Sequence, residues 1–167
     1  VTLLIASTQY VEEMNAELAS AYVYFAMSAY FEAQGLKGFA GWLRQHAKEE
    51  LGHAVKIYTY VVSRSGTLRF DAIAAPHGKW NSSLAIFEEA LSREKAVTAA
   101  IDQLVDLTMK SSDHATHNFL QWFVSEQVEE EATVSDIVNQ LKLVKSDSGA
   151  LFMLDRDLGA KAVAPEA

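Results

Sequence analysis

The chain has 167 residues, half of them apolar, which is enough to bury the core of one domain. It contains no cysteine, so disulfides, thiolate metal sites and thiol catalysis are excluded. A formal net charge of −8 disfavours nucleic-acid binding, and the short apolar stretch 1–6 lacks the basic flank of a secretory signal and the length of a membrane span. We therefore expect a cytoplasmic protein with no nucleic-acid or membrane partner.

Helical periodicity dominates the first part of the chain. The only prolines, Pro76 and Pro165, lie outside the periodic stretches, so most of the chain is predicted to be helical. Ser7 is the expected N-cap of a first helix, which should end near Gly35. A second helix is expected from about residue 36 to 64.

Residues 66–81 break the periodicity and form the one long connection. Ser82 and Ser83 are expected to open a third helix that ends near Lys110, and a fourth is expected over 114–144. Short connections make successive helices antiparallel, whereas the long one lets helices 2 and 3 run parallel. The expected fold is an all-α four-helix bundle with a long crossover between helices 2 and 3.

The C-terminal part is expected to add a short fifth helix over about 150–158. A single domain would then cover residues 1–160. Residues 161–167, rich in Ala, Val and Pro, are expected to form a disordered tail.

An acidic run, 125–131, lies inside the apolar seam of the predicted fourth helix. Glu130 has Phe123 seven positions before it and Val134 and Ile137 four and seven positions after it. An unpaired carboxylate on such a face is energetically costly, so the seam needs cations, hydrogen-bond donors or a metal ion.

Each of the other three long helices also carries an acid on its apolar stripe. These are Glu17, Glu50 and Glu94, and His53 follows Glu50 at i+3. One such Glu alone more often pairs with Lys or reaches solvent, and Glu-x-x-His alone is a weak signal. Four seam acids that converge with one histidine in the crossover topology favour a metal centre. Carboxylates with one imidazole suit Fe(II) or Mn(II) better than zinc, and a bridging Glu can hold two ions, so reaction of Fe(II) with dioxygen is the expected chemistry.

The chain resembles the non-haem ferritins of bacteria and archaea through Glu17, Glu50-x-x-His53, Glu94 and the run Phe119–Glu131. The resemblance covers nearly the whole chain, including the crossover and the segment 151–158. It implies a ferritin-like fold, a ferroxidase that oxidises Fe(II) with dioxygen or peroxide, and iron storage and detoxification. It also implies a homo-oligomeric cage of 24 subunits that holds the ferric mineral.

The resemblance implies a dinuclear ferroxidase centre within each subunit. One iron would be bound by Glu17, Glu50 and His53, and the second by Glu50, Glu94 and Glu130, with Glu50 bridging the two.

Further residues match neighbours of that centre. Gln127 would stand beside the first iron as a hydrogen-bonding neighbour, Tyr24 would supply an electron, and Trp122 would be a second redox-active neighbour. A third, more weakly held iron would take Glu49, Glu126, Glu129 and Glu130.

The chain departs from two related branches. Bacterioferritins and rubrerythrins carry a second Glu-x-x-His where this chain has Gln127 and Glu130. Bacterioferritins bind haem through a methionine where this chain has Leu51, so no haem is expected. The absence of cysteine excludes the cysteine-ligated iron of rubrerythrins.

Two other functions and several weaker features stay open. A storage cage with a degraded centre would take up iron passively, and a diiron oxidase would act on an organic substrate or peroxide. His46, at i−4 from Glu50, is interpreted as a hydrogen-bonded core histidine rather than a ligand. Asp113, His114 and His117 are interpreted as a helix cap and two surface histidines, with ion entry as the alternative. Trp80 in the crossover is expected at a subunit contact.

Overall fold

Five helices make up the secondary structure of the computed structural model, which describes residues 2–145 and 147–163. The elements are α1 (Thr2–Gln34), α2 (Lys37–Ser63), α3 (Ser83–Ser111), α4 (His114–Val144) and α5 (Ser148–Val163). Within those residues no strand is formed, and the predicted all-α class is confirmed.

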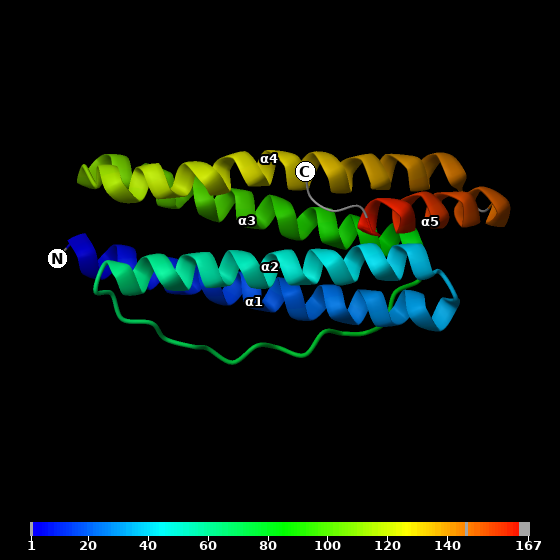
Figure 1. Ribbon diagram of the computed structural model, residues 1–167, viewed down its shortest axis with the longest axis horizontal. Helices are drawn as coiled ribbons and strands as arrows, with labels where there is room; N and C mark the ends of the chain where they lie inside the picture. The colour runs from blue at the N-terminus through cyan, green and yellow to red at the C-terminus, as the bar shows by residue number, and fades with distance from the viewer. Residues whose placement is uncertain (1, 146, 164–167) are drawn as a thin grey trace.

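The four long helices form the predicted crossover bundle (Figure 1). α1 and α2 are an antiparallel pair, and so are α3 and α4. The irregular segment 64–82 runs the length of the bundle, so α2 and α3 point in the same direction. α5 packs mainly on α2, near the turn between α1 and α2.

Side-chain caps fix two helix starts where the sequence predicted them. The hydroxyl of Ser82 accepts a hydrogen bond from the N–H of Ala85, and Asp113 accepts one from the N–H of Thr116. Gly35 follows α1 with a φ of 78°, a left-handed conformation that glycine adopts without strain.

Two helix ends differ from expectation. The prediction that α1 starts at Ser7 is wrong, because the helix begins at Thr2; residues 2–6 contain neither proline nor glycine to stop it. α5 extends to Val163, so it includes residues 161–163 of the expected tail. Residues 164–167 lie outside the described part of the chain.

A close approach between helices anchors α5. A Cβ atom on Gly38 would lie 1.6 Å from the backbone oxygen of Asp155. The carboxylate of Asp155 accepts the N–H of Phe39 at 2.8 Å, and Asp155 is buried. Gly38 therefore lets α5 sit directly on the first turn of α2.

Two apolar clusters fill the ends of the bundle. At the α5 end the rings of Phe31, Phe39 and Phe87 pack with centroids 4.9 to 6.0 Å apart. At the opposite end, Ile57 and Phe123 belong to the second cluster. The polar layer described below lies between these clusters. Among the described residues, no helix combines the length and apolar character of a membrane span.

Candidate metal centre

The four long helices bring the predicted seam residues into one buried layer. Each of these residues is at most 7 % exposed: Glu17, Glu50, His53, Glu94, Gln127 and Glu130. The helical period places each on its inner face, and the crossover topology turns those faces toward one another.

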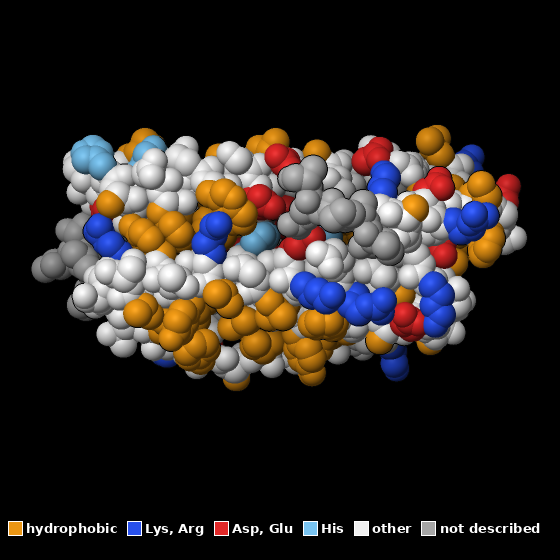
Figure 2. All heavy atoms as spheres, in the orientation of Figure 1, with side chains coloured by type: hydrophobic (Ala, Val, Ile, Leu, Met, Phe, Trp, Pro, Cys, Tyr) orange, Lys and Arg blue, Asp and Glu red, His pale blue; other side chains and the backbone are white. Residues whose placement is uncertain are grey.

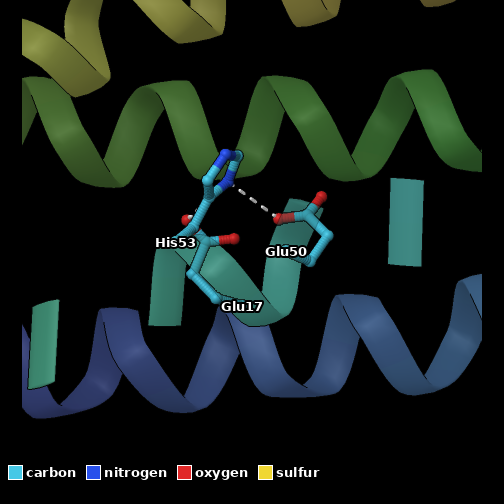
Figure 3. Close-up of side chains that lie close together, drawn as sticks. All are labelled: Glu17, Glu50 and His53. Atoms are coloured by element: carbon cyan, nitrogen blue, oxygen red, sulfur yellow. Dashed lines mark hydrogen bonds and ion pairs between the residues drawn. The ribbon is translucent and has the colours of Figure 1, made fainter. Parts of the chain in front are cut away.

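Glu17 of α1 and the pair Glu50 and His53 of α2 form the best-defined group (Figure 3). Each offers one ligand atom, and these atoms lie within 4.8 Å of one another. The Nδ1 atom of His53 lies 3.2 Å from an oxygen of Glu50 and 3.8 Å from one of Glu17. Neither oxygen of Glu17 has a hydrogen-bond partner. A buried carboxylate without a donor is the state that a bound cation would relieve.

Glu94 forms the other end of the layer. Tyr24, fully buried on α1, donates its hydroxyl to Glu94. The Nε2 atom of Gln127 lies 3.4 Å from an oxygen of the Glu94 carboxylate and 3.2 Å from its backbone oxygen. Gln127 therefore hydrogen-bonds to a residue of the second predicted ligand set, because α4 packs on α3.

His46 joins Glu130 to Glu49 on the face between α2 and α4. Its Nδ1 atom lies 2.9 Å from Glu49, and its Nε2 atom lies 2.9 Å from Glu130. The contact of Nε2 with Glu130 is an ion pair when the imidazole is protonated. His46 also stacks on Trp42 with ring centroids 3.7 Å apart. His46, Glu49 and Glu130 form a group that could hold a metal ion. From the sequence, His46 is instead interpreted as a hydrogen-bonded core histidine.

The residues predicted for a third iron are divided between two groups. Glu49 and Glu130 meet at His46, whereas Glu126 and Glu130 meet at His53. Glu129 is exposed and belongs to neither of these groups. Figure 2 shows acidic side chains and a histidine gathered on the face between α2 and α4.

Burial controls the charge of this layer. It raises the pKa of Glu94 to about 7, with the charge of Glu50 adding to the effect. It raises the pKa of Glu17 well above the usual range, and Glu50 raises it further. Burial also opposes ionisation of Glu50, but its contacts with His53 and Glu17 outweigh that penalty and lower its pKa. Without a metal ion, burial therefore favours the protonated forms of Glu17 and Glu94, and a dication would displace those protons.

One buried acid was missed by the sequence interpretation. Glu13 lies one helical turn before Glu17, is 3 % exposed, and has an oxygen without a hydrogen-bond partner. Burial, together with the charge of Glu50, raises the pKa of Glu13 to about 7. Its spacing of four residues from Glu17 is the signal that could have revealed it.

Two aromatic residues singled out from the sequence have specific contacts. Trp122 meets His53 edge-on at 5.4 Å between ring centroids, and the amine of Lys56 lies 3.6 Å above its ring. Trp80 is half-buried, and its indole N–H donates a hydrogen bond to Glu89 at 2.7 Å.

The polar residues at the start of α4 serve mainly to join helices. Besides capping α4, Asp113 pairs with Arg64 of the α2 C-terminus at 3.2 Å. His117 lies 3.3 Å from the hydroxyl of Thr108, and His114 is exposed.

Comparison with known proteins gives consistent matches. A family model described as a ferritin-like domain matches residues 9–144. A bacterial non-heme ferritin from Bacteroides fragilis is 38 % identical over 150 residues, which cover 90 % of this chain and 93 % of the relative. One from Staphylococcus aureus is 39 % identical over 150 residues, covering 90 % of both chains.

Solved structures of ferritins have the same fold. A humanized archaeal ferritin superposes with a TM-score of 0.93 and 43 % identity, covering 96 % of this chain and 98 % of its own. An open pore ferritin from the archaeon Archaeoglobus fulgidus gives a TM-score of 0.91 and 44 % identity, covering 93 % of this chain and 96 % of its own.

Proposed function

The chain belongs to the ferritin family, and from this premise we propose that it takes up Fe(II), oxidises it at a dinuclear centre in each subunit and stores the ferric product inside a protein cage. The observation that carries the proposal is the buried layer of carboxylates, in which Glu17 has no hydrogen-bond partner and lies beside His53. We further propose that this work takes place in the cytoplasm, as the sequence leads us to expect.

Iron is the substrate of this centre. Glu17, Glu50 and His53 bind the first Fe(II), and Glu50, Glu94 and Glu130 bind the second. Four carboxylates balance the charge of two Fe(II) ions, which offsets the burial and mutual repulsion that otherwise favour protonation of Glu17 and Glu94.

Reduction of each dioxygen to peroxide requires two electrons. Each Fe(II) gives one, so two ferric ions form and dioxygen is reduced to the level of hydrogen peroxide. Tyr24, whose hydroxyl is bonded to Glu94, is placed to supply one of the two further electrons that reduction of the peroxide to water requires. Glu49 and Glu126, each grouped with Glu130 at the α2–α4 face, hold a third iron more weakly, with exposed Glu129 outside both groups.

An apolar surface supports self-association. Large apolar side chains are exposed on α1 and α2, and Figure 2 shows an extended orange area there. The apolar patch consists of Tyr22, Phe25, Leu51, Val55, Tyr58 and Val62. A patch of this kind is typical of an interface between protein chains. We propose a homo-oligomeric cage of 24 subunits, the assembly that the family resemblance implies.

Iron uptake by the metal-free protein tests the proposal. The purified protein is sized, given more than two Fe(II) per subunit in air, and followed by ferric absorbance. We expect a large assembly that stays soluble while it oxidises many irons per subunit. A small oligomer that stops at two irons would instead indicate a diiron oxidase.

Variants separate catalysed oxidation from passive uptake. His53→Ala and Glu130→Ala should each slow the fast phase of oxidation, because each removes a ligand. A fast phase that is unaltered in both variants would show that the centre lies elsewhere or that uptake is passive.

A further inference from the structure

Glu131 is connected to the metal layer through Thr98. The hydroxyl of Thr98 on α3 lies 2.6 Å from a carboxylate oxygen of Glu131 on α4. The same hydroxyl oxygen lies 3.4 Å from Nε2 of Gln127, which contacts the Glu94 carboxylate at 3.4 Å. A continuous hydrogen-bonded path therefore runs from half-buried Glu131 to a proposed metal ligand.

The direction of these hydrogen bonds follows from counting protons. Thr98 has a single hydroxyl proton, and a carboxylate oxygen accepts hydrogen bonds. In the short contact, the Thr98 hydroxyl therefore donates its hydrogen bond to Glu131. The oxygen of Thr98 is then left to accept. The N–H of Gln127 can satisfy it, whereas the side-chain carbonyl of Gln127 cannot. Glu131 thereby determines which end of the Gln127 amide faces α3.

Glu131 lies beside a cavity between α3 and α4. Thr98, Gln127 and Glu131 border a cavity of about 410 Å³ between α3 and α4. Glu131 is half-buried there, so its carboxylate meets both solvent and the hydroxyl of Thr98.

Loss of Glu131 would free the Thr98 hydroxyl to donate elsewhere. The backbone oxygen of Glu94 lies 3.1 Å from it and now also accepts from Gln127. The amide of Gln127 could then turn and present its carbonyl oxygen to the Glu94 carboxylate. Two acceptors facing each other repel, which would move the Glu94 carboxylate away from the position in which Gln127 now holds it.

We propose that Glu131 and Thr98 are positioning residues that hold the N–H of Gln127 toward Glu94 and so strengthen binding of the metal ion that Glu94 ligates. The inference rests on the proposed function, in which Glu94 is a ligand. It assigns Glu131 a role in metal binding without contact to the metal.

Calorimetric titration of the metal-free protein with Zn²⁺ tests this role without any oxidation step. The ion held by Glu94 is identified as the one lost in Glu94→Gln. Thr98→Val and Glu131→Ala should each lower the affinity for that ion about tenfold, which is the low end of the effect seen for residues that orient metal ligands. The ion held by Glu17 and His53 should keep its affinity.

Three further variants sharpen the result. Thr98→Ser keeps the hydroxyl and should restore the affinity of the wild-type protein. The double variant Thr98→Val with Glu131→Ala should be no weaker than either single variant, because both break one path. Asp102→Ala removes an exposed acid that borders the same cavity and should leave Zn²⁺ binding unchanged.

The outcomes are distinct. Unchanged Zn²⁺ affinity in Thr98→Val and Glu131→Ala would overturn the inference alone, and so would an equal loss in Asp102→Ala or an equal weakening of both ions. A wild-type protein that fails to bind two Zn²⁺ ions would overturn the proposed function, and this inference with it.

Discussion

His46 Nε2 lies 2.9 Å from Glu130 Oε2, a contact that joins α2 to α4 across the face of the candidate metal centre. The other nitrogen of His46 lies 2.9 Å from Glu49. Burial works against a charged imidazole, but the two carboxylates outweigh it and raise the pKa of His46 to about 10. His46 is therefore a cation at neutral pH and stands where a metal ion would otherwise neutralise these acids.

The charged His46 should stabilise the metal-free protein over a defined pH range. Its pKa is about 10 when folded and about 6.5 when unfolded, so its contribution is fully present below pH 6.5 and is lost as pH rises through 10. The melting temperature of His46→Gln should lie below that of the wild-type protein at pH 6.5, and the gap should narrow toward pH 10. His77→Gln removes an exposed histidine that pairs with Glu89 and should leave only a small gap. A gap for His46→Gln that is constant with pH would contradict the ion pair.

Stabilisation by a dication should increase with pH. Burial, aided by the charge of Glu50, raises the pKa of Glu94 from an ordinary 4.5 to about 7, so the stability of the metal-free protein falls as pH rises between these values. Zn²⁺ replaces the protons, and its effect should therefore be larger at pH 7.5 than at pH 5. The increase in melting temperature with Zn²⁺, measured at both pH values, checks this. Glu94→Gln should reduce the difference, and an equal increase at both pH values would contradict it.

Much of the fold and the ligand set follows from helical geometry. Apolar residues lie three, four and seven positions from each of Glu17, Glu50, Glu94 and Glu130. This spacing is sufficient to predict that each glutamate lies on the inner face of its helix. The length of the segment 66–81 predicts the crossover, because only a long connection can make helices 2 and 3 parallel.

Other features depend on packing that periodicity does not specify. Glu13 and His46 lie four residues before Glu17 and Glu50, so helical period brings them toward the same faces, but the packing of neighbouring helices decides which groups they meet. Glycine is unfavourable in the interior of a helix, but Gly38 admits the backbone of Asp155 from α5. The contact between Thr98 and Glu131 likewise depends on how α3 sits against α4.

Glu13 should destabilise the metal-free protein at high pH. Its pKa is raised by burial, and by the charge of Glu50, to about 7, so a folded chain must hold a buried carboxylate at pH 8 but not at pH 5. Glu13→Gln should therefore raise the free energy of unfolding by about 1–3 kcal/mol at pH 8 and have little effect at pH 5. Urea denaturation at both pH values measures the change.

The neighbouring Glu12 provides the control. It is exposed, so Glu12→Gln should change the free energy of unfolding little at either pH. Equal effects of Glu13→Gln at pH 5 and pH 8 would show that ionisation of Glu13 is not the cause.

The apolar patch on α1 and α2 should be required for assembly. Val55 and Tyr58 are 62 % and 45 % exposed and lie three residues apart, so they share one face of α2. The double variant Val55→Glu with Tyr58→Glu would bury two charges in any interface formed there, and it should reduce the assembly to small species. Sedimentation measures the size, and Zn²⁺ binding checks that the bundle still holds its metal layer, since both side chains point outward. Leu143→Glu replaces an 82 % exposed side chain on α4, outside the patch, and should leave the assembly intact. If the double variant sedimented like the wild-type protein, the patch would not be the contact that holds the subunits together.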